Sequence, residues 1–177
     1  MRLVFFTIWM ITISFSLRAQ HPNIKWVKTA HGNSYDAPWD VRTDQQGNVY
    51  FVGMFDSDTL KVDTTLLNNQ VENSNFSKYT IFLLKYSLKG ELIWAKNFHS
   101  DGNLGYPHMD ISKTNHIILT FYARNFKIIR FDTNQISIPK ENYKGMVVNY
   151  LDQHGNLLWY KFLIDSVLTH GHGRILF

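Results

Sequence analysis

The stretch KGELIWAKNF (residues 89–98) returns 65 positions later as HGNLLWYKFL (residues 154–163), and a shorter form, IKWVK, stands at residues 24–28. All three copies contain Trp-x-Lys, with the tryptophan at positions 26, 94 and 159. In the two longer copies a glycine precedes the tryptophan by four residues. Such regular spacing indicates an internal repeat, and repeats of this length form stacked structural units.

Short strand-like segments and tight turns fill the chain between these copies. Runs of Val, Ile, Phe, Tyr, Trp and Thr broken by Gly, Asn and Asp are typical of β-strands joined by turns. The strands expected in the first unit are 39–43, 48–55, 80–87 and 91–98, and those in the second are 108–112, 116–122, 146–152 and 156–162. Segment 59–67 is expected to continue or extend the hairpin of the first two strands. Segment 130–136 is its equivalent in the second unit.

Both faces of the expected sheets carry apolar residues. Side chains alternate along a strand, so Trp94, Lys96 and Phe98 share one face, and Ile93 and Ala95 share the other. A sheet with two apolar faces is covered on both sides. We therefore expect each tryptophan to be a wedge between adjacent sheets, with the aliphatic stem of the following lysine against its ring.

The order GNVYFVG (residues 47–53) and then IFLLKYSLKGELIWAKNF (residues 81–98) resembles the SBBP-type β-propeller repeat of exported bacterial proteins. In the second copy, residues 115–121 lack both glycines of the first motif, whereas YLDQHGNLLWYK (residues 150–161) matches closely. The likeness covers about residues 24–162. A weaker likeness exists to the PQQ-like propeller repeat, whose units are usually shorter.

The resemblance implies an all-β fold of antiparallel four-stranded blades. Closed propellers have about four to eight blades, whereas this chain holds about two plus flanking strands. The resemblance therefore implies an incomplete propeller and a fragment of a longer protein. The expected parts are a leading strand at 24–30, blades at 39–98 and 108–162, and a linker with the start of a truncated third blade at 163–177. The residues that carry the repeat are Trp26, Lys28, Gly47, Gly53, Gly90, Trp94, Lys96, Gly155, Trp159 and Lys161. Open blade edges invite self-association.

The N-terminus, MRLVFFTIWMITISFSLRA, has the pattern of a signal peptide. Arg2 precedes an almost uncharged apolar run, and Ala19 is the small residue expected before a cleavage point. The alternative is an uncleaved anchor, but the run is shorter than the ~20 apolar residues that span a bilayer. We expect residues 20–177 to be exported to the periplasm, the cell surface or the medium, with no membrane role after cleavage.

Composition restricts the class of function. The chain has no cysteine, so an exported form relies on apolar packing rather than on disulfides. Of the formal charge of +4, two charges belong to Arg2 and Arg18, and the remaining basic residues are scattered among acids. Nucleic-acid binding needs a basic face or stripe, so we expect no nucleic-acid partner.

Few residues suggest metal binding. His170 and His172, in a Gly-rich loop, form the one local cluster, but a site normally needs three or four ligands, and we expect a plain loop instead. Asp56, Asp58 and Asp63 have the spacing of an acidic calcium loop, but the glycine and the terminal glutamate of that motif are missing. We expect no metal and no cofactor.

The sequence favours binding over catalysis. It has no G-x-S-x-G elbow, no cysteine nucleophile and no Gly-rich phosphate loop. Most aromatic residues stand at strand positions that core packing explains, but Trp39 opens a first strand, where propeller loops converge, and its counterpart is expected at His108 or Met109. The leading hypothesis is a non-enzymatic module with a protein or glycan partner. The alternatives are part of a secreted propeller enzyme and a degenerate fragment without independent function.

Overall fold

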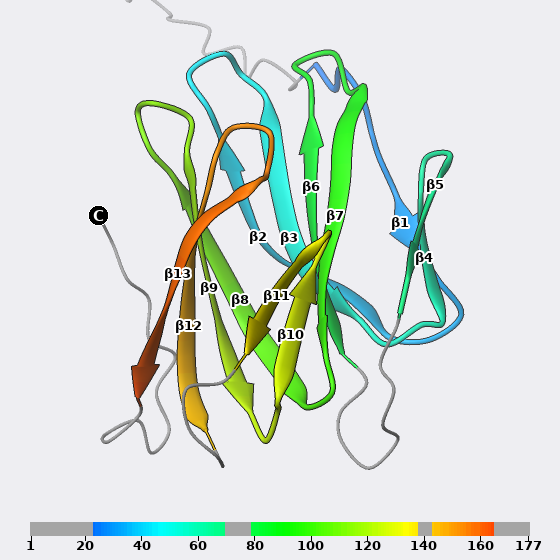
Figure 1. The fold of residues 1–177 in the computed structure, drawn as a ribbon. Coiled ribbons are helices and arrows are strands. Elements are labelled where there is room, and N and C mark those ends of the chain that lie inside the picture. Colours follow the sequence, from blue (N-terminus) through cyan, green and yellow to red (C-terminus); the bar gives the residue numbers. More distant parts are fainter. Residues whose placement is uncertain (1–22, 70–78, 138–142, 165–177) are drawn as a thin grey trace, which may run out of the picture.

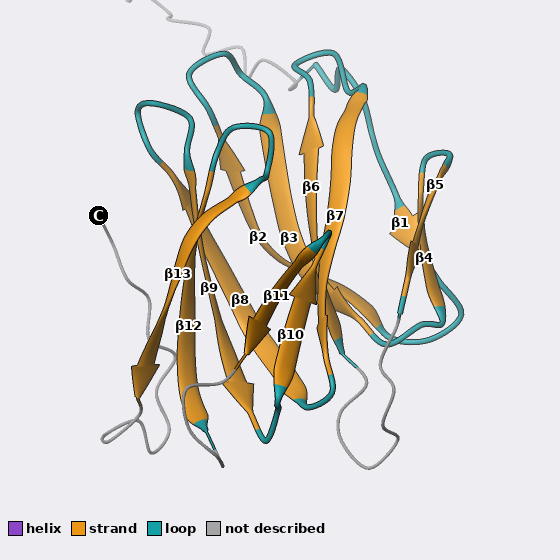
Figure 2. Ribbon diagram, viewed as in Figure 1, coloured by secondary structure: helices purple, strands orange, loops and turns teal. Residues whose placement is uncertain are grey.

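The computed structural model describes residues 23–69, 79–137 and 143–164, and this part of the chain is all-β (Figures 1 and 2). It contains thirteen strands and no helix, and every strand pair in it is antiparallel. The all-β class and the antiparallel sheets expected from the sequence are thereby confirmed. The described residues form no helix that could cross a membrane.

Two four-stranded meanders form the body of the structure. The first meander consists of β2 (Asp36–Thr43), β3 (Val49–Phe55), β6 (Thr80–Tyr86) and β7 (Leu92–Ser100). The second meander consists of β8 (Asn103–Ile111), β9 (Ile117–Arg124), β12 (Lys144–Leu151) and β13 (Leu157–Ile164). In both meanders each strand pairs with the next. These strands lie in the segments where the sequence predicts four strands each.

A hairpin is inserted at the same place in each meander, between its second and third strands. The hairpins are β4 (Thr59–Val62) with β5 (Thr65–Asn68), and β10 (Ile128–Phe131) with β11 (Asn134–Ser137). Each leaves its own meander: β10 pairs with β7, and β4 pairs with β1 (Ala30–His31). The first sheet therefore has six strands, β11-β10-β7-β6-β3-β2, and the second has four.

Two details of the predicted strands are wrong. Segment 59–67 does not extend the β2–β3 hairpin, because β4 pairs with β1 in a separate three-stranded sheet. The leading strand expected at 24–30 is reduced to Ala30–His31, because among the described residues this segment pairs with β4 at two positions. Figure 1 shows this small sheet and β13 on opposite sides of the molecule.

Four turns share one hydrogen-bond pattern. They join β2 to β3, β6 to β7, β8 to β9 and β12 to β13, and they begin at Asp44, Ser87, Ser112 and Asp152. In each turn the backbone N–H of the fourth residue donates to the carbonyl of the first, and the first residue's side chain accepts backbone N–H groups. The fourth residue has a positive φ and is Gly47, Gly90, Asn115 or Gly155. Glycine and asparagine tolerate this conformation best.

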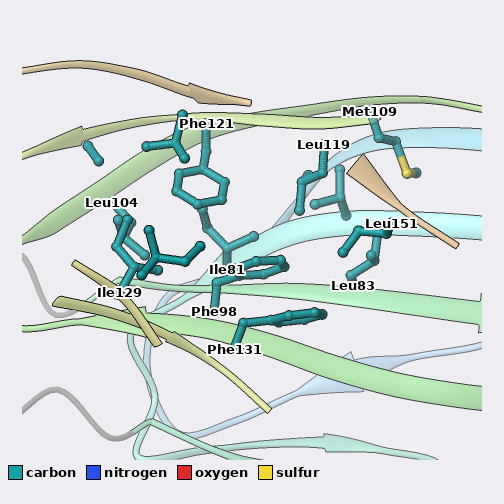
Figure 3. Packing of buried hydrophobic residues seen from close by; sticks show 14 of the residues in the cluster. Ile81, Leu83, Phe98, Leu104, Met109, Leu119, Phe121, Ile129, Phe131 and Leu151 are labelled. Carbon is teal, nitrogen blue, oxygen red and sulfur yellow. The ribbon is translucent and has the colours of Figure 1, made fainter. Parts of the chain in front are cut away.

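The main core lies between the two sheets (Figure 3). Ile81 and Leu83 of the first sheet face Leu119 and Phe121 of the second, and all four side chains are buried. The opposite face of the first sheet is also buried, because Phe82 and its neighbours pack in a second cluster under β4 and β5. The first sheet is therefore covered on both sides, as its two apolar faces indicate.

Candidate functional site

The repeated tryptophans pack on the repeated glycines of the next unit. Trp26 lies on the turn between β6 and β7, where a Cβ atom built on Gly90 would be 2.6 Å from its Cγ, and its Nε1 donates to the Leu88 carbonyl at 3.1 Å. A Cβ atom on Gly155 would be 2.9 Å from Cδ and Cε of Lys96 and 3.3 Å from Cη2 of Trp94, so this glycine receives the lysine stem together with the tryptophan. The Gly-x-x-x-Trp motif therefore makes contacts in two directions. Its glycine packs against the tryptophan of the preceding unit, and its tryptophan packs against the following unit.

The repeated lysines bind a carboxylate on the next inserted hairpin. Lys96 forms an ion pair with Asp132, in the β10–β11 turn, and lies 5.5 Å from the ring centroid of Phe131. Lys28 forms the equivalent ion pair with Asp63, at 2.9 Å. Each lysine thus reaches beyond its own tryptophan to the hairpin of the neighbouring unit.

The sequence matches segment 130–136 with 59–67 and places Asp63 in a calcium-like spacing, but it does not predict that the two aspartates pair with the repeated lysines. The signal for a shared role is the pair of segments VDTT (residues 62–65) and FDTN (residues 131–134), which stand 69 positions apart. Both Asp63 and Asp132 have a positive φ, of 52° and 49°, because each begins the tight turn of its hairpin.

The remaining repeat residues differ in their surroundings. Gly53 lies against the Phe82 ring and the Ala37 carbonyl, which leave no room for a Cβ atom. Trp159 stacks on Tyr150 with ring centroids 5.2 Å apart, and it is 48% exposed. In the part of the chain that the structure describes, Trp159 and Lys161 meet neither a turn glycine nor a hairpin aspartate of a following unit.

The first strands of the two meanders, β2 and β8, lie in contact and carry matching β-bulges. The bulge in β2 contains Trp39, and the one in β8 contains residues 106–107. Asp40 and His108 follow the two bulges at equivalent registers, so the counterpart of Trp39 lies within 106–107. The counterpart expected at His108 or Met109 is therefore wrong, because a bulge re-aims the side chains at this point.

Three aromatic rings gather at these bulges. Trp39 and Tyr106 meet edge to face, with ring centroids 5.6 Å apart, and Tyr106 meets Tyr122 in the same way at 6.5 Å. The Tyr106 side chain is 51% exposed, and its backbone has a φ of 52°. A bulky residue in this left-handed region is an outlier, and such strain collects at binding and catalytic sites.

A charged row runs beside the rings and is formed by Asp40, Arg42, His108 and Asp110. Asp40 pairs with Arg42 and accepts the backbone N–H of Met109 at 3.3 Å. His108 Nδ1 lies 3.9 Å from Asp40, and Arg42 Nε lies 3.9 Å from Asp110. The row thus joins β2 to β8, and its side chains are partly exposed. Half-buried charges of both signs beside aromatic rings can orient a polar ligand.

The acids of the calcium-like spacing are engaged in separate contacts. Asp56 accepts the backbone N–H of Tyr35 at 2.7 Å, and Asp63 binds Lys28. The described residues contain no group of three or more His, Cys, Asp or Glu side chains that could hold a metal ion. His170 and His172 lie outside the described residues.

A buried polar cluster connects the two sheets at the Asp44 turn. Lys85 Nζ lies 3.9 Å from Asp44 and 4.9 Å from the ring centroid of Tyr50, and it donates to the Gln153 carbonyl at 3.2 Å. Burial lowers the pKa of Lys85 against the opposing effect of Asp44, and burial together with Asp44 raises the pKa of Tyr50. Gln153 and Leu88 hold equivalent positions in their turns. The Gln153 carbonyl accepts a hydrogen bond from Lys85, and the Leu88 carbonyl accepts one from Trp26.

No protein-family model matches the chain, and neither a curated protein nor a solved structure matches it. The resemblance to SBBP-type repeats therefore stays a prediction that rests on the motifs.

Proposed function

We propose that this chain is an exported, non-catalytic binding module built from β-propeller repeat units. Its partner, a protein or a glycan, binds the surface made by Trp39, Tyr106 and the charged row. The single observation that carries the proposal is the half-exposed ring of Tyr106, held against Trp39 by a left-handed backbone. Export rests on the pattern of residues 1–19, which lie outside the described part of the chain.

The backbone of Tyr106 supports a binding role. A non-glycine residue in the left-handed region costs about 1–3 kcal/mol and persists only where its surroundings hold it. Half of the ring faces solvent, so burial of apolar area returns only part of that cost. Rigid aromatic side chains with a polar tip are the usual anchors of binding surfaces.

The charged row supports binding rather than acid–base chemistry. The Asp40 carboxylate accepts hydrogen bonds from Arg42 and from the backbone N–H groups of Val41 and Met109, which fix its position. Arg42 lies between Asp40 and Asp110. Such fixed charges suit the orientation of hydroxyl, amide or carboxylate groups of a partner.

The test is binding of the purified chain to an array of immobilised oligosaccharides, with a displayed random-peptide library in parallel. We expect saturable binding to at least one probe, weakened at least tenfold by Trp39→Ala and by Tyr106→Gly. Tyr106→Gly is the sharper variant, because it removes the ring and relieves the left-handed strain, so the thermal midpoint should change little.

The matched control is Val41→Ala, which removes an exposed apolar side chain from the same strand outside the ring cluster. This variant should bind like the wild type. Absence of binding to every oligosaccharide and every peptide contradicts the proposal. Equal loss in Val41→Ala and Tyr106→Gly places the binding surface elsewhere and contradicts it as well.

A further inference from the structure

The outer face of the second sheet repeats a face that is covered in the first sheet. On β7, Trp94, Lys96 and Phe98 point toward the second sheet, and Trp159, Lys161 and Leu163 hold the same register positions on β13. The three β13 residues are exposed, with Trp159 the largest of them. The β13 face is therefore exposed, whereas the equivalent β7 face is covered by the second sheet.

Within the chain this type of surface is received twice by the same kind of socket. A socket consists of a turn glycine, on which the tryptophan packs, and the aspartate of an inserted hairpin, which pairs with the lysine; at Gly155 the stem of the lysine also packs on the glycine. The first socket has Gly90 and Asp63, and the second has Gly155 and Asp132.

The free edge of β13 repeats the strand edge that accepts an inserted hairpin. On β7 this edge pairs with β10, with Phe98 opposite Phe131. Within the described residues β13 is the outermost strand of the second sheet and pairs with β12 on one side only. By the register of the repeat, Leu163 would stand opposite Val62 when a β4–β5 hairpin docks there, because Val62 is the equivalent of Phe131.

A short segment of the same chain occupies the first socket. Trp26 and Lys28 occupy it, and the strand pairing of their segment with β4 covers Ala30 and His31 only. Ile24 and Val27 of this segment are exposed. The segment IKWVK (residues 24–28) and the β13 segment LLWYK (residues 157–161) share the side chains that the socket receives, so one can replace the other.

We infer that the occupant of the β13 face is a second copy of this chain. Its Gly90–Asp63 socket opens by release of residues 24–31 and receives Trp159 and Lys161 of the first copy. The contact is head-to-tail, because a copy gives one surface and receives on another, and such contacts close into rings or run on as fibres. With two repeat units in each copy, a ring of about four to eight units contains two to four copies.

The first experiment is light scattering after size-exclusion chromatography, with variants at either end of the contact. The wild-type chain should form an oligomer of two to four copies. Lys161→Asp damages the outgoing surface and Asp63→Lys damages the socket, so each alone should associate at least tenfold more weakly. An equimolar mixture of the two should associate again. In the mixture, the aspartate of Lys161→Asp can pair with the lysine of Asp63→Lys, and the unchanged Lys161 of the second variant can pair with the unchanged Asp63 of the first.

The control for charge is Lys113→Asp, which makes the same change at an exposed position in the turn between β8 and β9. It should associate like the wild type. A monomeric wild-type chain overturns the inference and leaves the face to another occupant. A mixture that stays as weak as its components overturns the head-to-tail contact.

A reversible lock tests the release of residues 24–31 separately. Ala30 and Val62 are directly opposite each other in an antiparallel pair, a distance that suits a disulfide, and the chain has no other cysteine. The oxidised Ala30→Cys, Val62→Cys double variant should stay monomeric, and reduction should restore the oligomer. Equal association of the oxidised and reduced forms contradicts the exchange of this segment.

Discussion

Phe131 lies flat on Phe98, with ring centroids 3.8 Å apart and an interplanar angle of 9°. Phe98 belongs to the last strand of the first meander, and Phe131 belongs to the hairpin inserted in the second. Both side chains are fully buried. This stack ties the two units together and places the Asp132 turn beside Lys96, so it also positions the ion pair that ends the repeat interface.

Truncation of this stack should be costly. Phe131→Ala removes a fully buried ring between two sheets, and such changes cost about 3–5 kcal/mol. Urea denaturation at neutral pH measures the loss. The matched variant is Phe131→Val, because valine is the residue at the equivalent position, Val62, and it should cost less than the alanine. A loss below about 1 kcal/mol for Phe131→Ala shows that the hairpin is not part of the cooperative core.

The turn glycines should separate into two classes on substitution by asparagine. Asparagine already holds this conformation at Asn115, so the backbone accepts it. At Gly47 the atom nearest to an added Cβ is at the flexible end of Leu88, at 3.0 Å, and Gly47→Asn should cost less than about 1 kcal/mol. At Gly155 it meets the side chains of Lys96 and Trp94, and Gly155→Asn should cost about 1–3 kcal/mol. Equal costs in thermal melts would contradict the packing role of Gly155.

The meanders and their turns could be predicted because local chemistry decides them. Alternation along β7 indicates two covered faces, and Asp or Ser at the first turn position with Gly at the fourth gives a turn wherever it stands. The spacing of Trp94 from Trp159 reports the length of one unit. Each of these signals lies within a few residues of the structure that it specifies.

The pairing of the inserted hairpins could not be predicted in the same way. Nothing in residues 59–62 shows that β4 pairs with β1 instead of continuing the β2–β3 hairpin, because strand alternation does not name a partner. The bulges could not be predicted for a similar reason: the sequences of β2 and β8 do not show where each strand carries an extra residue, so the counterpart of Trp39 cannot be placed at 106–107 from the sequence. The ring cluster of Trp39 and Tyr106 depends on those bulges.

The ion pair between Lys96 and Asp132 should show a small, measurable coupling between units. The Lys96 side chain is largely buried, whereas that of Asp132 is more exposed, so the pair is partly screened. A double-mutant cycle of Lys96→Met and Asp132→Asn should give about 0.5–1 kcal/mol. The cycle of Lys28→Met and Asp63→Asn is the internal comparison and should give a similar value. Coupling in neither pair would mean that apolar contacts alone set the interface.

The Asp44 turn should make stability depend on acid. Burial alone would raise the pKa of Asp44, but hydrogen bonds from Asn48 and Tyr50 and the charge of Lys85 outweigh it and hold the pKa below its ordinary value of 3.8. The folded chain therefore releases this proton more readily than the unfolded chain. The stabilisation is complete above pH 3.8 and is lost as the pH falls through the folded pKa.

A serine at this position separates the turn from the titration. Ser87 and Ser112 hold the equivalent place in two other turns, so Asp44→Ser should keep the hydrogen bonds from the turn backbone while it removes the ionisable group. Urea denaturation from pH 6 to pH 2.5 should give the wild type a steeper loss of unfolding free energy than Asp44→Ser below about pH 4. The variant should also lose stability at pH 7, because Lys85 and Tyr50 lose their buried partner. Parallel pH profiles would show that another carboxyl group governs the acid response.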